Sequence, residues 1–183
     1  MAKTPRLALI TEEIADAEQR RVGDLIYRHL EPFQGPSAVL LQVPELADRV
    51  VQLRDHVRNA GMRNDLLQLV TLVTARHWSA NYVWTVREEM AREAGIAASV
   101  IDAIRRRQRP DFTDRDQQAI YTYVMELLGP VGVSDAVHAG VVAVLGEKGV
   151  IELVAAVGVY TILALTTRAA DLPIQPGATP LAK

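Results

Sequence analysis

Apolar residues recur at helical spacing along most of the chain, and glycine or proline separates one such stretch from the next. This pattern predicts amphipathic helices, each with one buried face. No run alternates apolar with polar residues as a half-buried strand would, so the sequence predicts an all-α fold class. We expect helices at about residues 11–31, 37–43, 44–61, 97–107, 113–128, 134–145 and 150–170.

Polar residues and prolines predict where these helices begin and end. Thr11 is a suitable N-cap for the first helix, and Pro32 would end it. Thr113 and Asp116 resemble a capping box at the start of a later helix. In the helix that Pro44 opens, one apolar face is expected to contain Leu46, Val50, Leu53 and Val57.

The longest periodic stretch covers residues 64–94. Ser79 and Asn81 lie near its middle, and their side chains compete with the backbone for hydrogen bonds. The sequence therefore leaves open whether this stretch forms one long helix or two.

Residues 150–170 are apolar on nearly every side, although Glu152 and Tyr160 interrupt the stretch. Its most apolar run, 150–165, is shorter than the roughly 20 residues that a membrane span needs, so we expect a core helix and no membrane contact. One subunit of this size offers such a helix little cover, which favours a homo-oligomer. The alternative is that neighbouring helices of the same subunit cover it.

Length and composition indicate a single helical domain at residues 1–172 with an extended or mobile tail at 173–183. The net charge of −2 gives no general attraction to nucleic acid, and the run Arg105–Arg107 is expected to be a solvated helix end. The chain has no cysteine and no apolar leader at its start, so we expect a cytoplasmic protein without disulfides.

Two sequence features together resemble the carboxymuconolactone decarboxylase and AhpD-like family over roughly residues 39–170. The first is Tyr82-x-Trp84-x-x-Arg87 followed by Ala91 and Gly95, where the family pattern has His in place of Arg87. The second is the stretch 145–153 with the glycine and tyrosine that follow it. The resemblance implies an AhpD-like multi-helix bundle that assembles as a trimer or hexamer, with its active site near the first motif.

Two chemistries are known in that family, and this chain departs from both. The redox cysteines of the thiol peroxidases fall on Ala80 and Val83, their histidine falls on Arg87, and an upstream glutamate falls approximately on Gln68. Without a thiol the chain cannot be a peroxidase of this type. The decarboxylase pattern loses its Glu at Val83 and its His at Arg87 but keeps Tyr82 and Trp84, so a lyase activity stays possible.

The candidate site follows from placing these residues on one continuous helix. Arg76, Ala80, Val83 and Arg87 would then lie within about 60° of one another, with Trp84 at the edge. Guanidinium groups and an aromatic wall suit a flat organic anion. We expect Arg87, His77 and Tyr82 to be catalytic, and the substrate to contact Trp84, Arg76, Val83 and Ala80.

Structural roles are the alternatives for these side chains. Tyr82, Trp84 and His77 could simply pack in the core, and Arg87 could pair with Glu88, Glu126 or Glu152. The four histidines form no metal-binding motif, and no phosphate-binding loop occurs, so no metal or cofactor is expected.

The leading functional hypothesis is a cofactor-independent lyase, a carboxymuconolactone decarboxylase-like protein, that acts on a small carboxylated acid or lactone. The alternatives are a catalytically inactive oligomeric binding or scaffold protein on the same fold, and a different reaction that depends on His77.

Overall fold

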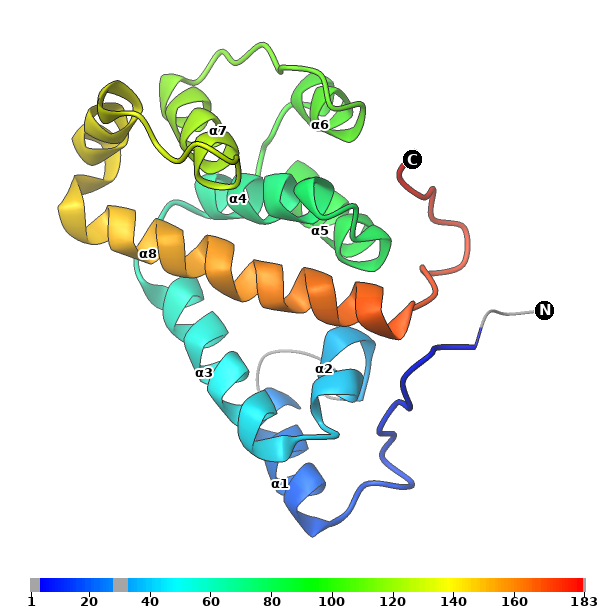
Figure 1. The fold of residues 1–183 in the computed structure, drawn as a ribbon. Coiled ribbons are helices and arrows are strands. Elements are labelled where there is room, and N and C mark those ends of the chain that lie inside the picture. Colours follow the sequence, from blue (N-terminus) through cyan, green and yellow to red (C-terminus); the bar gives the residue numbers. More distant parts are fainter. Residues whose placement is uncertain (1–3, 28–32, 183) are drawn as a thin grey trace.

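The computed structural model describes residues 4–27 and 33–182, and these residues form helices and loops without a strand, which confirms the all-α class (Figure 1). The eight helices in this part of the chain are α1 (Ala17–Tyr27), α2 (Gly35–Leu40), α3 (Pro44–Asn59), α4 (Asn64–His77), α5 (Asn81–Glu93), α6 (Ala98–Arg105), α7 (Arg115–Leu127) and α8 (Asp135–Ala170).

Helix α8 runs between two groups of helices. Helices α1 to α3 lie on one side of it and α4 to α7 on the other (Figure 1). It packs against α2 and α3 from the first group and against α4, α5 and α7 from the second. The apolar helix predicted at residues 150–170 therefore does lie centrally in the domain.

Helix α4 is the most completely buried element, with every residue from Leu66 to Arg76 shielded from solvent. Its two threonines satisfy their hydroxyl groups within the helix: Thr71 donates to the Gln68 carbonyl at 2.9 Å and Thr74 to the Val70 carbonyl at 2.8 Å. These bonds let polar residues occupy a helix that is otherwise apolar.

Helix α8 bends at Gly146, whose φ of 70° and ψ of 167° are not helical. The sequence predicts two helices here, 134–145 and 150–170, with residues 146–149 turning the chain. The structure has one helix that bends at Gly146 alone, and residues 147–149 are helical. Beyond the bend, one face of α8 is buried and the opposite face exposes apolar side chains: Ile151, Val154, Ile162 and Leu165. Length and composition alone would let α8 cross a membrane. Its inner face nevertheless packs against both groups of helices.

Two predicted helix caps are wrong. Helix α1 begins at Ala17, and Asp16 caps it, because the Asp16 carboxylate accepts from the Gln19 N–H at 2.8 Å while the Gln19 side chain accepts from the Asp16 N–H. At α7 the cap is Asp114, which accepts from the backbone N–H groups of the second and third helical residues. The predicted end of the first helix, at 28–31, lies outside the described residues.

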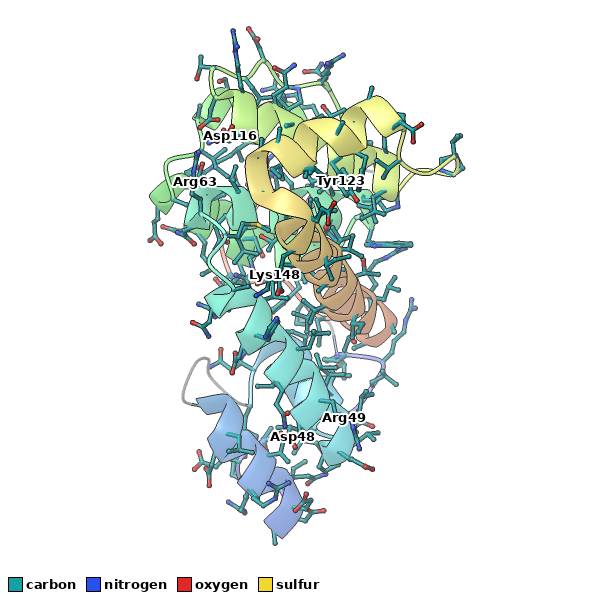
Figure 2. All side chains as sticks on the ribbon, turned by 90° about the vertical axis from the view of Figure 1, so that its left-hand side faces the viewer. Asp48, Arg49, Arg63, Asp116, Tyr123 and Lys148 are labelled. Carbon is teal, nitrogen blue, oxygen red and sulfur yellow. The ribbon has the colours of Figure 1, made fainter. Side chains whose placement is uncertain are left out.

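The starts of α4 and α7 are joined by one arginine (Figure 2). Arg63 donates to Asp116 at 2.8 Å, to Asp114 at 2.8 Å and to Asp65 at 2.7 Å. Gln117 of α7 also donates to Asp65 of α4 at 3.0 Å, so these two side chains join the N-terminal ends of helices that are far apart in sequence.

Residues 173–182 form no helix and are anchored to the domain. Leu172 and Leu181 are buried, and the Leu181 N–H donates to the Asn81 side chain at 2.8 Å. The segment between them passes beside α5.

We predict that Gly146→Ala lowers the free energy of unfolding by about 1–3 kcal/mol, because only glycine adopts this backbone conformation without strain. Gly140→Ala is the matched control: Gly140 lies in the regular part of α8 with open space at its Cβ position. It should raise stability by about 0.5–1 kcal/mol. Urea unfolding at one protein concentration measures both, and equal effects would contradict the assigned strain.

Candidate active site

The stretch 64–94 forms two helices, because the chain turns between His77 and Asn81. Ser79 has a left-handed backbone with a φ of 49°. The Ala80 N–H donates back to the Ala75 carbonyl at 2.9 Å, as in a Schellman-type helix end. The face expected on one continuous helix therefore does not form, and α4 and α5 direct their side chains into different surroundings.

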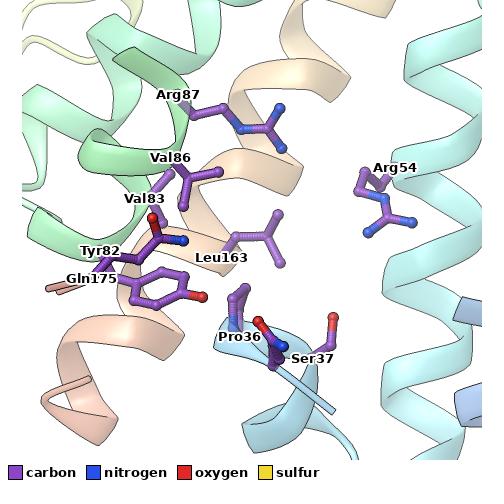
Figure 3. Close-up of a pocket in the computed structure, with 10 residues that line it drawn as sticks. Pro36, Ser37, Arg54, Tyr82, Val83, Val86, Arg87, Leu163 and Gln175 are labelled. Atoms are coloured by element: carbon purple, nitrogen blue, oxygen red, sulfur yellow. The ribbon is translucent and has the colours of Figure 1, made fainter. Parts of the chain in front are cut away.

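A cavity of about 210 Å³ opens between α5, α8 and the first group of helices (Figure 3). It brings together three of the predicted site residues, Arg87, Tyr82 and Val83. The other lining residues are Gln34, Pro36, Ser37, Arg54, Val86, Leu163 and Gln175. No histidine, aspartate or glutamate is among the described residues that line it.

Arg87 lies at one end of this cavity and is 6% exposed. One of its terminal nitrogens is 3.2 Å from the Met90 sulfur, which is a weak acceptor, and its guanidinium lies 4.9 Å from the centre of the Tyr160 ring. Burial lowers the pKa of Arg87; the charge interaction with Tyr160 opposes this, and the positive charges of Arg58 and Arg54 add to it. The group stays cationic.

None of the ion pairs proposed for Arg87 forms. Glu88 accepts from Arg92 and Arg105, Glu152 lies 3.0 Å from the His56 ring, and Glu126 accepts from Ser134. Within residues 4–27 and 33–182, no carboxylate is within salt-bridge distance of Arg87. The cavity therefore contains a buried cation that these residues do not neutralise.

Arg54 supplies a second guanidinium from the opposite wall (Figure 3). It is 2% exposed and donates to Asp55 at 3.0 Å, so its charge is compensated in part. Arg54 was not predicted, because the face of α3 that is buried differs from the expected one: Leu46 and Leu53 are exposed. The buried face of α3 contains Ala47, Val50, Val51, Arg54 and Val57. Arg54 continues the helical spacing of these apolar residues, and this is the sequence signal that could have identified it as a site residue.

Tyr82 is held against the start of α2. A Cβ atom at Gly35, where φ is 56°, would meet the Tyr82 hydroxyl at 2.6 Å. Glycine at this position therefore lets the tyrosine ring approach the backbone and close one side of the cavity.

Trp84 and Ala80 are fully buried and do not line the cavity. The Trp84 indole N–H donates to the Glu88 carboxylate at 3.0 Å, and the guanidinium of Arg105 lies 5.3 Å from the indole ring centre. Arg105 also donates to Glu88 and is thus not part of a solvated arginine run. This buried group connects α5 to α6.

Arg76 and His77 line a separate hollow beside Arg107 and Tyr121. Arg76 donates to the Arg105 carbonyl at 2.8 Å, at the C-terminal end of α6, where a cation is favoured. Burial lowers the pKa of His77, and the charge of Arg107 lowers it further. The structure does not bring these two residues to the cavity that contains Arg87.

No metal cluster is found in the described part of the chain, where no three His, Cys, Asp or Glu side chains come together as ligands would.

Comparison with solved structures identifies the fold. The debrominase Bmp8, as a cysteine-to-alanine variant bound to 2,3,4-tribromopyrrole, aligns with a TM-score of 0.76 at 14% identity, covering 96% of this chain and 95% of that one. Its apo form gives a TM-score of 0.74 at 14% identity, with 93% of each chain covered.

A protein of unknown function from Agrobacterium tumefaciens, described as a candidate antioxidant defence protein AhpD, gives a TM-score of 0.67 at 14% identity, covering 78% of this chain and 99% of that one. No family model and no curated protein matches the sequence. The chain thus has the AhpD-like fold, as the resemblance implied.

We predict that Glu88→Gln lowers the free energy of unfolding near neutral pH by about 3 kcal/mol, because Arg105 loses its buried partner. Burial raises the pKa of Glu88, but hydrogen bonding and charge from Arg105, and the charge of Arg92, outweigh burial and lower it from 4.5. The folded state therefore binds this proton more weakly than the unfolded chain.

The contribution of Glu88 is complete above pH 4.5 and is lost as the pH falls below that value. Urea unfolding measured at pH values above and below 4.5 should show that the wild type loses stability more steeply than Glu88→Gln as the pH falls. Glu89→Gln, at an exposed neighbouring position, is the control and should follow the wild type.

Proposed function

We propose that the cavity at Arg87 binds a small organic anion, and that the protein is a cofactor-independent lyase acting on a small carboxylated acid or lactone. The observation that carries the proposal is a buried guanidinium, without a carboxylate partner among the described residues, at the wall of a cavity. A volume of about 210 Å³ lies below the roughly 300–1,000 Å³ of drug-sized sites, which favours a small ligand.

The lining favours a ligand that is part apolar and part charged. Val83, Val86 and Leu163 form an apolar wall next to Arg87. A guanidinium can hold two oxygens of an anion through parallel hydrogen bonds. The structurally similar debrominase Bmp8 forms a complex with 2,3,4-tribromopyrrole, so a protein of this fold can bind a small planar ring.

Arg87 constrains how a decarboxylation would proceed. Arginine stays charged, so it cannot transfer protons as the family's histidine can. It can stabilise negative charge that develops on an enolate oxygen, whereas binding the departing carboxylate would stabilise the ground state. A productive ligand would therefore direct its carbonyl or enolate oxygen to Arg87 and its departing carboxylate to the apolar wall.

Binding without catalysis is the second candidate function. It is favoured by the absence of an acidic or imidazole side chain among the described residues that line the cavity. The chain would then be an oligomeric binding or scaffold protein that has kept the fold. Both candidates require anion binding, and only the lyase converts its ligand.

We predict that Arg87→Gln weakens binding of a small aromatic carboxylate by at least roughly tenfold, the loss expected for a charge-assisted hydrogen bond. Benzoate and pyrrole-2-carboxylate are the probes, benzamide is the neutral control ligand, and isothermal titration calorimetry is the measurement. Arg115→Gln removes a charge at an exposed position and should bind as the wild type does. If neither carboxylate binds the wild type, or Arg87→Gln binds them equally, the proposal is wrong.

We also propose that the chain forms a homo-oligomer through the exposed face of α8. Ile151, Val154, Ile162 and Leu165 recur at spacings of three, eight and three residues on the straight part of the helix. Gly158 lies between them and is exposed, so a second helix could approach closely. This spacing is that of a helix–helix seam.

Combining Ile162→Glu with Leu165→Glu should convert the assembly to monomers, because two charges would have to be buried in an apolar contact. Sedimentation velocity measures the mass. Val131→Glu, at an apolar position that is 95% exposed outside α8, should leave the mass unchanged. A wild-type protein that sediments as a monomer would contradict the assembly.

A further inference from the structure

Two polar side chains line the cavity on the side opposite Arg87. They are Ser37 of α2 and Arg54 of α3, and both come from the first group of helices (Figure 3). Ser37 is only 5% exposed, so its polar group lies inside the protein and not at an open rim. The cavity therefore has polar groups on two opposite walls, with apolar side chains such as Leu163 in its lining.

The Ser37 hydroxyl is free to bind a ligand. It makes no hydrogen bond within the described residues, whereas the buried threonines of α4 and α8 donate to backbone carbonyls at 2.8–2.9 Å. Two side-chain polar atoms in this part of the chain are sealed from solvent without a partner, Oε1 of Gln68 and the hydroxyl oxygen of Tyr160, and the Ser37 oxygen is not one of them. What remains accessible of Ser37 therefore lines the cavity.

Arg54 also has an unused donor beside the cavity. Its Nε and Nη2 atoms donate to Asp55 at 3.3 Å and 3.0 Å, and its Nη1 atom makes no hydrogen bond within residues 4–27 and 33–182. The Nη1 atom is not among the sealed atoms either. Because Asp55 balances much of the charge, Arg54 offers the ligand a hydrogen-bond donor more than a positive charge. A second ligand carboxylate here would lie close to Asp55 and be repelled by it.

We infer that Ser37 and Arg54 form a second binding position in the cavity, which takes a neutral oxygen of the ligand. The inference rests on the proposed function and specifies its ligand: an organic anion with its charged oxygen at Arg87 and a hydroxyl or carbonyl oxygen at the opposite end. The serine hydroxyl can donate to or accept from such a group, and the guanidinium can donate to it. The ligand class is thus a small hydroxy- or oxo-acid with one negative charge.

Three benzoates substituted at the ring position opposite the carboxylate test this in the wild-type protein. 4-Hydroxybenzoate places a neutral oxygen at the far end, 4-methylbenzoate places an apolar group of similar size there, and terephthalate places a second carboxylate there. Isothermal titration calorimetry should show that 4-hydroxybenzoate binds about tenfold more tightly than either of the other two, because it alone gains a hydrogen bond without repulsion. This comparison does not depend on how any variant folds.

Variants identify the residues responsible. Ser37→Ala removes an unpaired hydroxyl and should reduce the preference for 4-hydroxybenzoate over 4-methylbenzoate to about threefold or less. Arg54→Lys keeps a cation beside Asp55 but lacks the planar fork, and it should reduce the same preference. Ser99→Ala, at an exposed serine in α6, is the matched control and should keep the full preference.

The outcomes separate this inference from the proposed function. If benzoate binds the wild type and Arg87→Gln loses it, but 4-methylbenzoate binds as tightly as 4-hydroxybenzoate, the second position is wrong and the anion site stands. Terephthalate binding more tightly than 4-hydroxybenzoate would also contradict the second position as a neutral one. A preference that Ser37→Ala and Arg54→Lys both retain would place the hydroxyl elsewhere and overturn the assignment. If neither the benzoates nor pyrrole-2-carboxylate bind the wild type, the proposed function fails and this inference fails with it.

Discussion

Helix α8 packs with its inner face against α2 and α3 on one side and α4, α5 and α7 on the other, and the cavity exists because of this packing. Its walls come from both groups: Arg54 from α3, Arg87 from α5 and Leu163 from α8 itself. Beyond its bend at Gly146, α8 is apolar enough to pack against both groups. The same composition leaves apolar side chains on the outer face, where they lack cover within one chain.

The helical pattern could be predicted because it depends on local signals. Pro44 does begin α3, and glycine does interrupt α8 at residue 146. The caps of α1 and α7 were predicted wrongly, because threonine and aspartate both occur as N-caps, and Thr11 and Thr113 precede the aspartates that cap these helices. Which one caps depends on where tertiary contacts place the first turn.

Of the predicted site residues, only Arg87, Tyr82 and Val83 line the cavity, and one backbone dihedral angle explains why Arg76 and His77 do not. A left-handed residue at Ser79 turns the chain, so Arg76 and His77 end beside α6 while Arg87 faces the cavity. Non-glycine residues adopt this conformation rarely, so the sequence gives it little weight. Leu163 and Gln175 line the cavity because of long-range packing, which helical periodicity does not predict.

Arg87 stands where the family pattern that the sequence resembles has histidine, and this difference affects the stability of the folded state. Burying a neutral imidazole costs less free energy than burying a guanidinium, because the charged group loses its hydration and needs an acceptor. The described residues give Arg87 a sulfur contact and an aromatic ring in place of a carboxylate. A bound anion would supply the missing acceptor and stabilise the folded protein in proportion to its occupancy. Under the proposed function, stability of the fold and binding at the cavity would therefore be coupled through Arg87.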